Sequence, residues 1–347
     1  MKKFNLQVLQ AMSGDSIFVS YIGDDNKEHN ILIDGGKPNT FQKSIKRVIK
    51  QINMLDYIFV THIDNDHIGG VNKLLGSSYQ NKIQNVFFNS AQFISKNSST
   101  MVSESDANTM IAFINKSDTL KSNKKEITID TKFDFFGLKI SFLSPTSEAL
   151  YYFNNSYTLD KVKGEALISD TEEEHKSNGT LLKLAKMEFG ETSLRDDPSN
   201  GASLAMLIEY QKKSILLLGD AKDSVLIPSL QQNYSKRNRL KVDYIKISHH
   251  GSKFHTSTKF LSLVECNHFI ISTDGKNNKN KHPNIETLAR VLCHDYRDRS
   301  QKTYFYFNYP KQEYINNGRR LLSLTEENDY NCECIYDYNF FQLGKEI

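Results

Sequence analysis

The most informative stretch of the sequence is residues 61–70, THIDNDHIGG, which directly follow the short apolar run Tyr57–Val60. It places His62, Asp64, Asp66 and His67 within six residues. A loop at the end of a strand can aim alternate side chains at one point, and paired glycines let the backbone turn tightly into the next element. Imidazole and carboxylate groups together suit divalent ions such as Zn²⁺ or Mn²⁺. The stretch therefore predicts a metal site, whereas a polar loop that only caps the next helix, with Asp66 as N-cap, needs one such residue and not four.

Working outward, the hydrophobic pattern predicts strands in two groups. Alternating or apolar runs indicate strands at 4–9, 16–21, 29–33 and 57–60, with a helix at 40–52 before the last of them. A second group of strands is predicted at 203–210, 214–218, 242–247 and 268–272, followed by a helix at 284–293. We therefore expect an α/β fold with two mixed β-sheets packed face to face and flanked by helices, an αββα sandwich.

The chain of 347 residues is interpreted as a single domain spanning 1–347. Between Leu150 and Pro198 the composition becomes polar and rich in charge, so residues 150–198 are predicted to be an insertion or lid, which leaves room for a protein partner. A C-terminal extension is expected from about residue 300.

The overall composition says more about where in the cell the protein is expected than about what it does. The net charge of +3 is too small to indicate a nucleic-acid partner by itself. None of the 4 cysteines forms a Cys-x-x-Cys pair, which favours free thiols in a reducing compartment. The longest apolar runs, Met110–Ile114 and Ala149–Phe153, fall far short of the roughly 20 residues that a membrane-spanning helix needs. We therefore expect no membrane span and a cytoplasmic protein.

The pattern His62-x-Asp64-x-Asp66-His67, followed by Gly69-Gly70, resembles the metal-binding signature of the metallo-β-lactamase fold superfamily. The commoner signature has histidine where this chain has Asp64, and the aspartate variant resembles the hydrolase domain of ComEC/Rec2 DNA-uptake proteins and some phosphodiesterases. Other family motifs have counterparts in the expected order, at residues 13–16, 31–36, 214–220, 246–252 and 282–283. The resemblance implies the metallo-β-lactamase fold and metal-dependent hydrolysis, with Asp34 in a structural role.

Asp220 follows an apolar strand and Gly219, which exposes one carboxylate at the edge of a sheet, where its two oxygens could bridge two cations. The resemblance implies the same bridging role, and a turn aspartate is the alternative. His249 and His250 would point to opposite sides if the preceding strand continued through them. One would then be a ligand and the other a substrate contact, and we favour His250 as the ligand.

The chain departs from the family pattern in one place. Relatives commonly supply a further histidine between the first cluster and the bridging aspartate, but the only one here is His175, inside the charged insertion. The matching place, residues 198–203, offers Asn200 as a weak oxygen ligand. Four more histidines lie outside the motifs and are interpreted as surface or core residues: His29, His255, His268 and His294.

Together these features predict a metal-dependent hydrolase of phosphate esters, a phosphodiesterase or nuclease that uses a metal-bound hydroxide. The expected cofactors are two ions of Zn²⁺ or Mn²⁺, and the expected metal ligands are His62, Asp64, Asp66, His67, Asp220 and His250. The expected catalytic residues are Asp66, His249 and His282, and Lys253 is a candidate substrate contact. The substrate is a phosphate ester and nucleic acid is a candidate. The alternatives are a hydrolase of another small ester, thioester or lactam, and a partner subunit of a larger complex, for example in defence, that retains the fold.

Overall fold

The computed structural model describes residues 2–89, 106–163, 179–276 and 281–344. Its first sheet has seven strands in the order β17-β1-β2-β3-β4-β5-β6. Their bounds are β1 Phe4–Val8, β2 Ile17–Ile22, β3 Glu28–Ile33, β4 Leu55–Phe59, β5 Ile83–Phe87, β6 Lys121–Ser122 and β17 Phe340–Gln342. The two strands predicted at 4–9 and 16–21 are confirmed as β1 and β2, which pair antiparallel as a hairpin. The next pair, β3 and β4, is parallel.

The second sheet has eight strands in the order β16-β15-β14-β12-β10-β9-β8-β7. Their bounds are β7 Lys132–Phe135, β8 Leu138–Ser144, β9 Ala205–Tyr210, β10 Lys213–Leu217, β12 Tyr244–Lys246, β14 His268–Ile271, β15 Thr303–Phe307 and β16 Cys332–Ile335. A small separate sheet pairs β11 Leu240–Lys241 with β13 Val264–Glu265. Strands β10, β12 and β14 are parallel to one another, so their carboxyl ends lie at the same edge.

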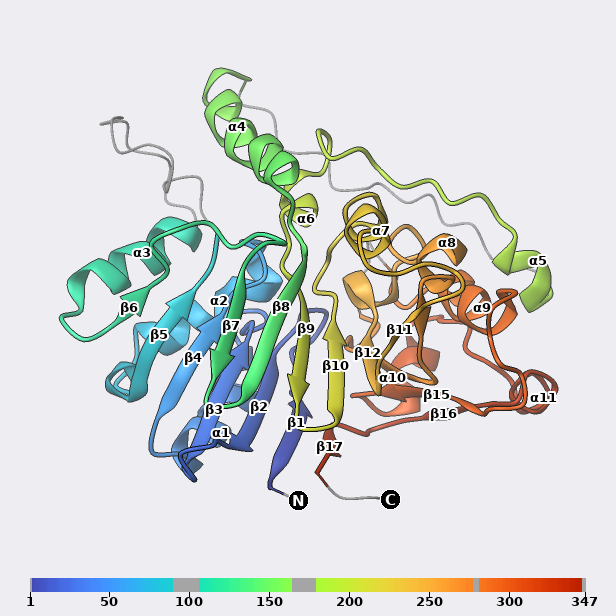
Figure 1. Ribbon diagram of the computed structural model, residues 1–347, viewed down its shortest axis with the longest axis horizontal. Helices are drawn as coiled ribbons and strands as arrows, with labels where there is room; N and C mark the ends of the chain where they lie inside the picture. The colour runs from blue at the N-terminus through green and yellow to red at the C-terminus, as the bar shows by residue number, and fades with distance from the viewer. Residues whose placement is uncertain (1, 90–105, 164–178, 277–280, 345–347) are drawn as a thin grey trace.

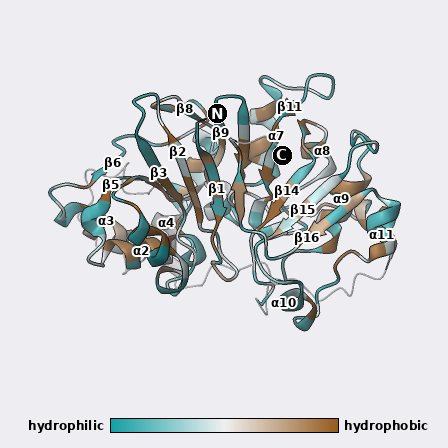
Figure 2. Ribbon diagram, turned by 90° about the horizontal axis from the view of Figure 1, so that it is seen from below, coloured by the Kyte–Doolittle hydropathy of each residue, from teal (hydrophilic) through white to brown (hydrophobic). Residues whose placement is uncertain are grey.

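Helices cover the outer faces of the sheets. The α-helices are α1 Lys46–Gln51, α2 Asn65–Leu75, α3 Asp106–Lys116, α4 Ser147–Lys163, α5 Leu181–Ala185, α6 Pro198–Gly201, α7 Asp223–Gln231, α8 Thr258–Leu261, α9 Ile285–Cys293, α10 Lys311–Asn316 and α11 Leu324–Asp329. Shorter turns of other helix types are η1 Phe41–Ile45, η2 Gln80–Lys82 and η4 Ser248–Gly251. Figure 2 shows strands in the middle of the molecule, with α2 and α3 on one side and α9 on the other.

Three apolar clusters explain this layering. One contains inward-facing side chains of both sheets, such as Ile31 of β3 and Ile208 of β9, and forms the core between them. A second joins Leu32 and Ile58 of the first sheet to α1, α2 and α3. A third joins the outer face of the second sheet to α5, α7, α8 and α9. The alternation of side chains therefore gives central strands such as β3 and β9 two buried faces, and the expected αββα sandwich is confirmed.

The chain between β8 and β9 leaves the sheets and returns. These two strands are antiparallel neighbours, although residues 145–204 separate them in sequence. The excursion contains α4, α5 and α6, and in Figure 1 its yellow-green part runs from α5 across to α6. This excursion includes residues 150–198, the segment predicted to be an insertion or lid. The residues after 300, expected to be an extension, supply β15 and β16 to one sheet and β17 to the other.

Candidate metal centre

The side chains of the candidate site come from loops that follow parallel strands. Asp34 follows β3, and the stretch that begins with His62 follows β4. Asp220 follows β10, while His249 and His250 follow β12. The two sheets meet here through backbone hydrogen bonds, since the Leu204 amide donates to the Thr61 carbonyl oxygen over 2.9 Å. The fold thus gathers residues as far apart in the sequence as Asp34 and His250.

Two glycines allow the start of α2 to lie close to the neighbouring turns. A Cβ atom on Gly70 would lie 1.9 Å from the carbonyl oxygen of Gly35, and one on Gly14 would lie 2.0 Å from that of Asp66. Both distances are impossible for a real side chain. The glycines therefore explain how α2 can bring Asp66 and His67 against the turns after β1 and β3.

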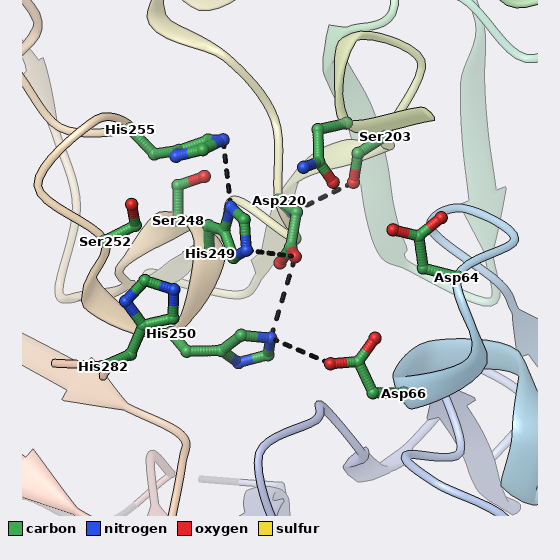
Figure 3. A network of polar contacts seen from close by, with 12 residues as sticks. Asp64, Asp66, Ser203, Asp220, Ser248, His249, His250, Ser252, His255 and His282 are labelled. Carbon is green, nitrogen blue, oxygen red and sulfur yellow. Dashed lines mark hydrogen bonds and ion pairs between the residues drawn. The ribbon is translucent and has the colours of Figure 1, made fainter. Parts of the chain in front are cut away.

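One oxygen atom, Oδ2 of Asp220, lies at the centre of the site. It is 3.3 Å from Nε2 of His67, 3.7 Å from Nε2 of His250, and 3.8 Å from Nε2 of both His62 and His249. Nε2 of His250 also lies 3.9 Å from Oδ2 of Asp66. Figure 3 shows His249 and His250 pointing toward Asp220, and Asp66 pointing toward His250. Asp220 is only 3% exposed, so its charge needs compensation from within the site.

The other nitrogen of three histidine rings is fixed by a hydrogen bond. Nδ1 of His67 donates to Oδ2 of Asp34 over 2.7 Å, and Nδ1 of His250 donates to the carbonyl oxygen of Ser272 over 2.9 Å. The Thr61 hydroxyl gives its hydrogen to Asp34, so it accepts from Nδ1 of His62, 3.0 Å away. In neutral rings of this kind each Nε2 carries a free lone pair, as a metal ligand must.

These Nε2 atoms provide the test of whether a cation fits. Within the described ranges, Nε2 of His62, His67 and His250 are buried and have no hydrogen-bond partner, and neither has Oδ1 of Asp220. Buried polar atoms are normally paired. Two sets of three residues each offer ligand atoms that lie within 4.8 Å of one another. One set is His62, His67 and Asp220, and the other is Asp66, His67 and His250. This donor set fits divalent cations.

The electrostatics of the site also favour positive charge. Burial opposes ionisation of His67, but the carboxylates of Asp220 and Asp34 raise its pKa well above the usual value. Burial likewise opposes ionisation of Asp220, yet the neighbouring His67, His249 and His250 hold its pKa well below the usual range. The cluster therefore keeps the Asp220 carboxylate ionised and favours a proton on His67, which a metal ion would replace.

Asp64 lies at the rim of the site. It is the N-cap residue of α2, but its side chain makes no capping hydrogen bond. Its Oδ1 accepts instead from the hydroxyl of Ser199 over 2.5 Å, and its Oδ2 lies 3.6 Å from Nε2 of His62. Burial opposes ionisation, but His62 and Ser199 lower the pKa of Asp64 to about 2. The interpretation of this stretch as a capping loop with Asp66 as N-cap is wrong, because Asp66 lies inside α2 and faces His250.

The expectation that His249 and His250 point to opposite sides is wrong. Strand β12 ends at Lys246, and both histidines adopt left-handed backbone conformations, with φ of 44° and 54°. Both Nε2 atoms consequently face Asp220. Only His250 has its Nδ1 fixed by a backbone carbonyl, whereas Nδ1 of His249 lies 3.1 Å from Nε2 of His255.

His255, interpreted from the sequence as a surface or core residue, is buried against this site, 1% exposed. His282 is also buried, and its ring centre lies 5.0 Å from that of His249. Burial, together with the charges of neighbouring histidines, holds the pKa of His255 and of His282 well below the usual value. His255 and His282 thus line one side of the site beside His249, outside the two ligand groups.

Two weaker candidates lie nearby with other contacts. Asn200 is buried in α6, where its Nδ2 donates to Asp197 over 3.1 Å and its Oδ1 has no hydrogen-bond partner in the described part of the chain. The ammonium group of Lys253 lies 4.9 Å above the ring of Phe254. Asn200 therefore has a spare oxygen, while Lys253 already has a partner.

Sequence reasoning missed a buried ion pair behind the ligands. Lys246 is completely buried, forms an ion pair with Asp15 and donates to the carbonyl oxygen of Gly219 over 3.0 Å. Its Nζ lies 3.9 Å from Oδ1 of Asp220, and Oδ1 of Asp15 lies 3.4 Å from Nδ1 of His250. Both residues stand in motifs quoted from the sequence, but nothing in the motifs indicated that they pair.

Comparison with known proteins supports the family expectation. The family model "Metallo-beta-lactamase superfamily" matches residues 12–79. ComE operon protein 3 of Bacillus subtilis is 30% identical over 127 residues, 36% of this chain and 16% of that protein. Recombination protein 2 of Haemophilus influenzae is 33% identical over 104 residues, 30% of this chain and 12% of that protein. The matches thus span less than a fifth of these relatives.

Among solved structures, Zn²⁺-bound PqqB from Methylobacterium extorquens resembles the chain with a TM-score of 0.45 and 11% identity, over 98% of this chain and 100% of that one. Similarity at this level says nothing about activity. The expected resemblance to the metallo-β-lactamase fold superfamily, and within it to ComEC/Rec2-type proteins, is confirmed by the matches in sequence. In the described ranges, no helix is both long and apolar enough to span a membrane.

Proposed function

From a metallo-β-lactamase fold with this cluster of ligands, we propose that the chain is a metal-dependent phosphodiesterase, with nucleic acid as a candidate substrate. The observation that carries the proposal is the convergence on Oδ2 of Asp220 of four histidine Nε2 atoms within 3.3–3.8 Å. Three of these atoms are buried without a partner in the described chain. In a purely structural core, such buried nitrogen atoms would have hydrogen-bond partners.

The residues divide into two half-sites that share Asp220. We propose that His62 and Asp64 hold one cation, with Asn200 as a weak oxygen ligand. Asp66, His67 and His250 hold the other. Two bound cations would supply a hydroxide at neutral pH and would clamp the oxygens of a phosphate group. Zn²⁺ and Mn²⁺ are the ions that this mixture of nitrogen and oxygen donors suits.

The remaining histidines act on the substrate side of the site. His249 points its Nε2 at Asp220 without a carbonyl fixing its other nitrogen, so it is free to contact a phosphate oxygen or the leaving group. His282 lies behind it with a buried Nε2 that has no hydrogen-bond partner in the described residues. Asp66 can accept a proton from the attacking water while its helix holds it in place.

Charge favours a phosphodiester over a thioester or lactam. Both the attacking and the leaving oxygen carry charge when a phosphodiester is displaced in line, so two cations help more than they do at a neutral carbonyl group. The name of one relative, Recombination protein 2, agrees with a nucleic-acid substrate, although it describes a much longer protein.

A substrate panel tests this proposal. The chain is supplied with Mn²⁺ or Zn²⁺ and assayed on bis-p-nitrophenyl phosphate, single-stranded DNA, duplex DNA, RNA, a thioester and a lactam. We expect turnover of a phosphodiester that disappears with a chelator. Turnover of the thioester or lactam alone would make the chain a hydrolase of another ester. Metal binding with no turnover at all would favour a partner subunit that retains the fold.

A further inference from the structure

The segment Phe189–Asp197, here called the strap, lies between α5 and α6 and connects the two halves of the candidate site. In Figure 1 it forms the yellow-green chain that passes above α7 and α8 toward α6. It has no helix or strand of its own. Its position therefore depends on side-chain contacts, and these lie at both of its ends.

Lys222 supplies the main contact on the side of the second sheet. This lysine is completely buried just before α7, two residues after Asp220. Its ammonium group forms an ion pair with Oδ2 of Asp197 at 2.8 Å, and donates to Oγ1 of Thr192 at 2.5 Å and to the carbonyl oxygen of Thr192 at 3.2 Å. All three partners belong to the strap. Burying an ammonium group is costly unless it is fully paired, so Lys222 holds the strap tightly.

Two further contacts support the same attachment. The backbone amide of Ser224, in α7, donates to the carboxylate of Glu191 over 3.1 Å. The guanidinium group of Arg290, in α9, lies 5.2 Å above the ring of Phe189. The strap is thus fixed to helices of the second sheet along its length.

The other end of the strap reaches a proposed metal ligand of the first sheet. Asp197 caps α6, because it accepts hydrogen bonds from the backbone amide and the side-chain amide of Asn200. From the same short helix the Ser199 hydroxyl donates to Oδ1 of Asp64. A continuous set of contacts therefore runs from Lys222 through Asp197 and Ser199 to Asp64.

Asp64 needs such a support. Its side chain is 45% exposed, compared with 29% for that of Asp66, and it makes no capping bond of its own. With Oδ1 held by Ser199, the free Oδ2 faces His62, 3.6 Å away. The half-site of His62 therefore depends on a partly exposed carboxylate.

We infer that Lys222 is a positioning residue that, through the strap, orients Asp64 and so completes the half-site of His62. The inference rests on the proposed metal-dependent function. Groups that orient a metal ligand from behind typically change metal affinity about 10- to 100-fold when they are removed. The half-site of Asp66, His67 and His250 has no contact with the strap through these residues and should be unaffected.

The test uses Lys222→Met, which keeps most of the volume and removes the charge. Mn²⁺ binding is measured by calorimetry, and trypsin cleavage after the exposed Arg195 of the strap is measured on the metal-free protein. We expect the weaker of two Mn²⁺ binding steps to lose about tenfold or more in affinity, the tighter step to remain, and cleavage after Arg195 to accelerate.

Three further variants separate the steps. Ser199→Ala should weaken the same Mn²⁺ step without accelerating cleavage, because it cuts only the link to Asp64. Thr192→Val, which keeps the ion pair, should loosen the strap in part if Lys222→Met does not fold. Lys213→Met is the matched control, since it removes a lysine paired with Asp243 at 2.9 Å outside the strap, and neither readout should change.

The possible failures are distinguishable. If the wild-type protein binds no Mn²⁺, the proposed function falls and this inference falls with it. If the wild-type protein binds two ions and both Lys222→Met and Ser199→Ala bind them equally well, the positioning role is wrong while the proposed function stands.

Discussion

Asp220 is the residue on which the site depends most directly, because both proposed half-sites share its Oδ2. Replacing it with alanine removes the shared ligand and leaves four imidazoles facing one another. We expect Asp220→Ala to lower bound metal to one ion or fewer and to reduce phosphodiester turnover at least about 100-fold. Elemental analysis and steady-state kinetics check this. Full metal content with undiminished turnover would rule out the bridging role.

Asp223, three residues further on, gives a prediction about pH. It is 1% exposed, and although Oδ2 accepts from the amide of Ser257 at 2.7 Å, burial raises its pKa to about 7, with a contribution from Glu191. The folded state therefore binds this proton more tightly than the unfolded state between about pH 4 and 7. Stability must fall as the pH rises through that range and stay lower above it.

Asp223→Asn keeps a hydrogen-bond acceptor for Ser257 but replaces the ionisable carboxyl group with a neutral amide. We expect the variant to match the wild type below about pH 4, to gain on it as the pH rises, and to exceed it at pH 8 by up to about 4 kcal/mol for a shift of about three pH units. Urea unfolding at several pH values measures the difference. The exposed Asp118→Asn serves as control, and an advantage for Asp223→Asn that does not grow with pH would contradict the assignment.

At the scale of elements, helix α2 delivers Asp66 and His67 only because it lies against the turn after β3. The amide of Gly70 donates to the carbonyl oxygen of Gly36 over 2.8 Å, and a Cβ on Gly70 has no room beside Gly35. Gly70→Ala should therefore push the helix outward, lower the free energy of unfolding by about 1–3 kcal/mol and weaken metal binding. Denaturant unfolding and metal titration measure both effects.

Gly179→Ala is the matched control for that change. A Cβ at Gly179 meets only Lys183 and Leu184 at ordinary distances of 3.4 Å or more. It should alter neither stability nor metal binding beyond a few tenths of a kcal/mol. Equal behaviour of the two variants would mean that the close approach of α2 is not required.

The elements also show which features could be read from the sequence. Hydrophobic periodicity predicted the strands that end at the site. The residue types at 62–67 predicted that metal ligands follow one of them. The orientation of His249 was mispredicted because strand β12 ends at Lys246, and two histidines, which rarely adopt a left-handed backbone, do so at residues 249–250 ahead of Gly251. The pairing of Asp15 with Lys246, and of β17 with β1, joins residues more than 200 positions apart, which local patterns do not encode.

For the molecule as a whole, the site concentrates negative charge between the two sheets. Five carboxylates, those of Asp15, Asp34, Asp64, Asp66 and Asp220, lie against the histidines of the site, and two of them, Asp15 and Asp220, also lie beside the buried ammonium group of Lys246. Cations that bind only the folded state stabilise it by about 2.7 kcal/mol at a concentration 100 times the dissociation constant. Excess chelator should therefore lower the melting temperature by roughly 5 °C, and readdition of Mn²⁺ or Zn²⁺ should restore it. Unchanged melting in chelator would indicate that no ion binds here.

The amount of metal bound to the purified protein tests the central claim most directly. The protein is stripped of metal with a chelator and dialysed against Mn²⁺ or Zn²⁺ under anaerobic conditions. Unbound metal is then removed, and the metal bound per chain is measured by elemental analysis. The geometry around Asp220 predicts two equivalents per chain for the wild type. Well under one equivalent with either ion would contradict a metal centre, and with it the proposed hydrolysis.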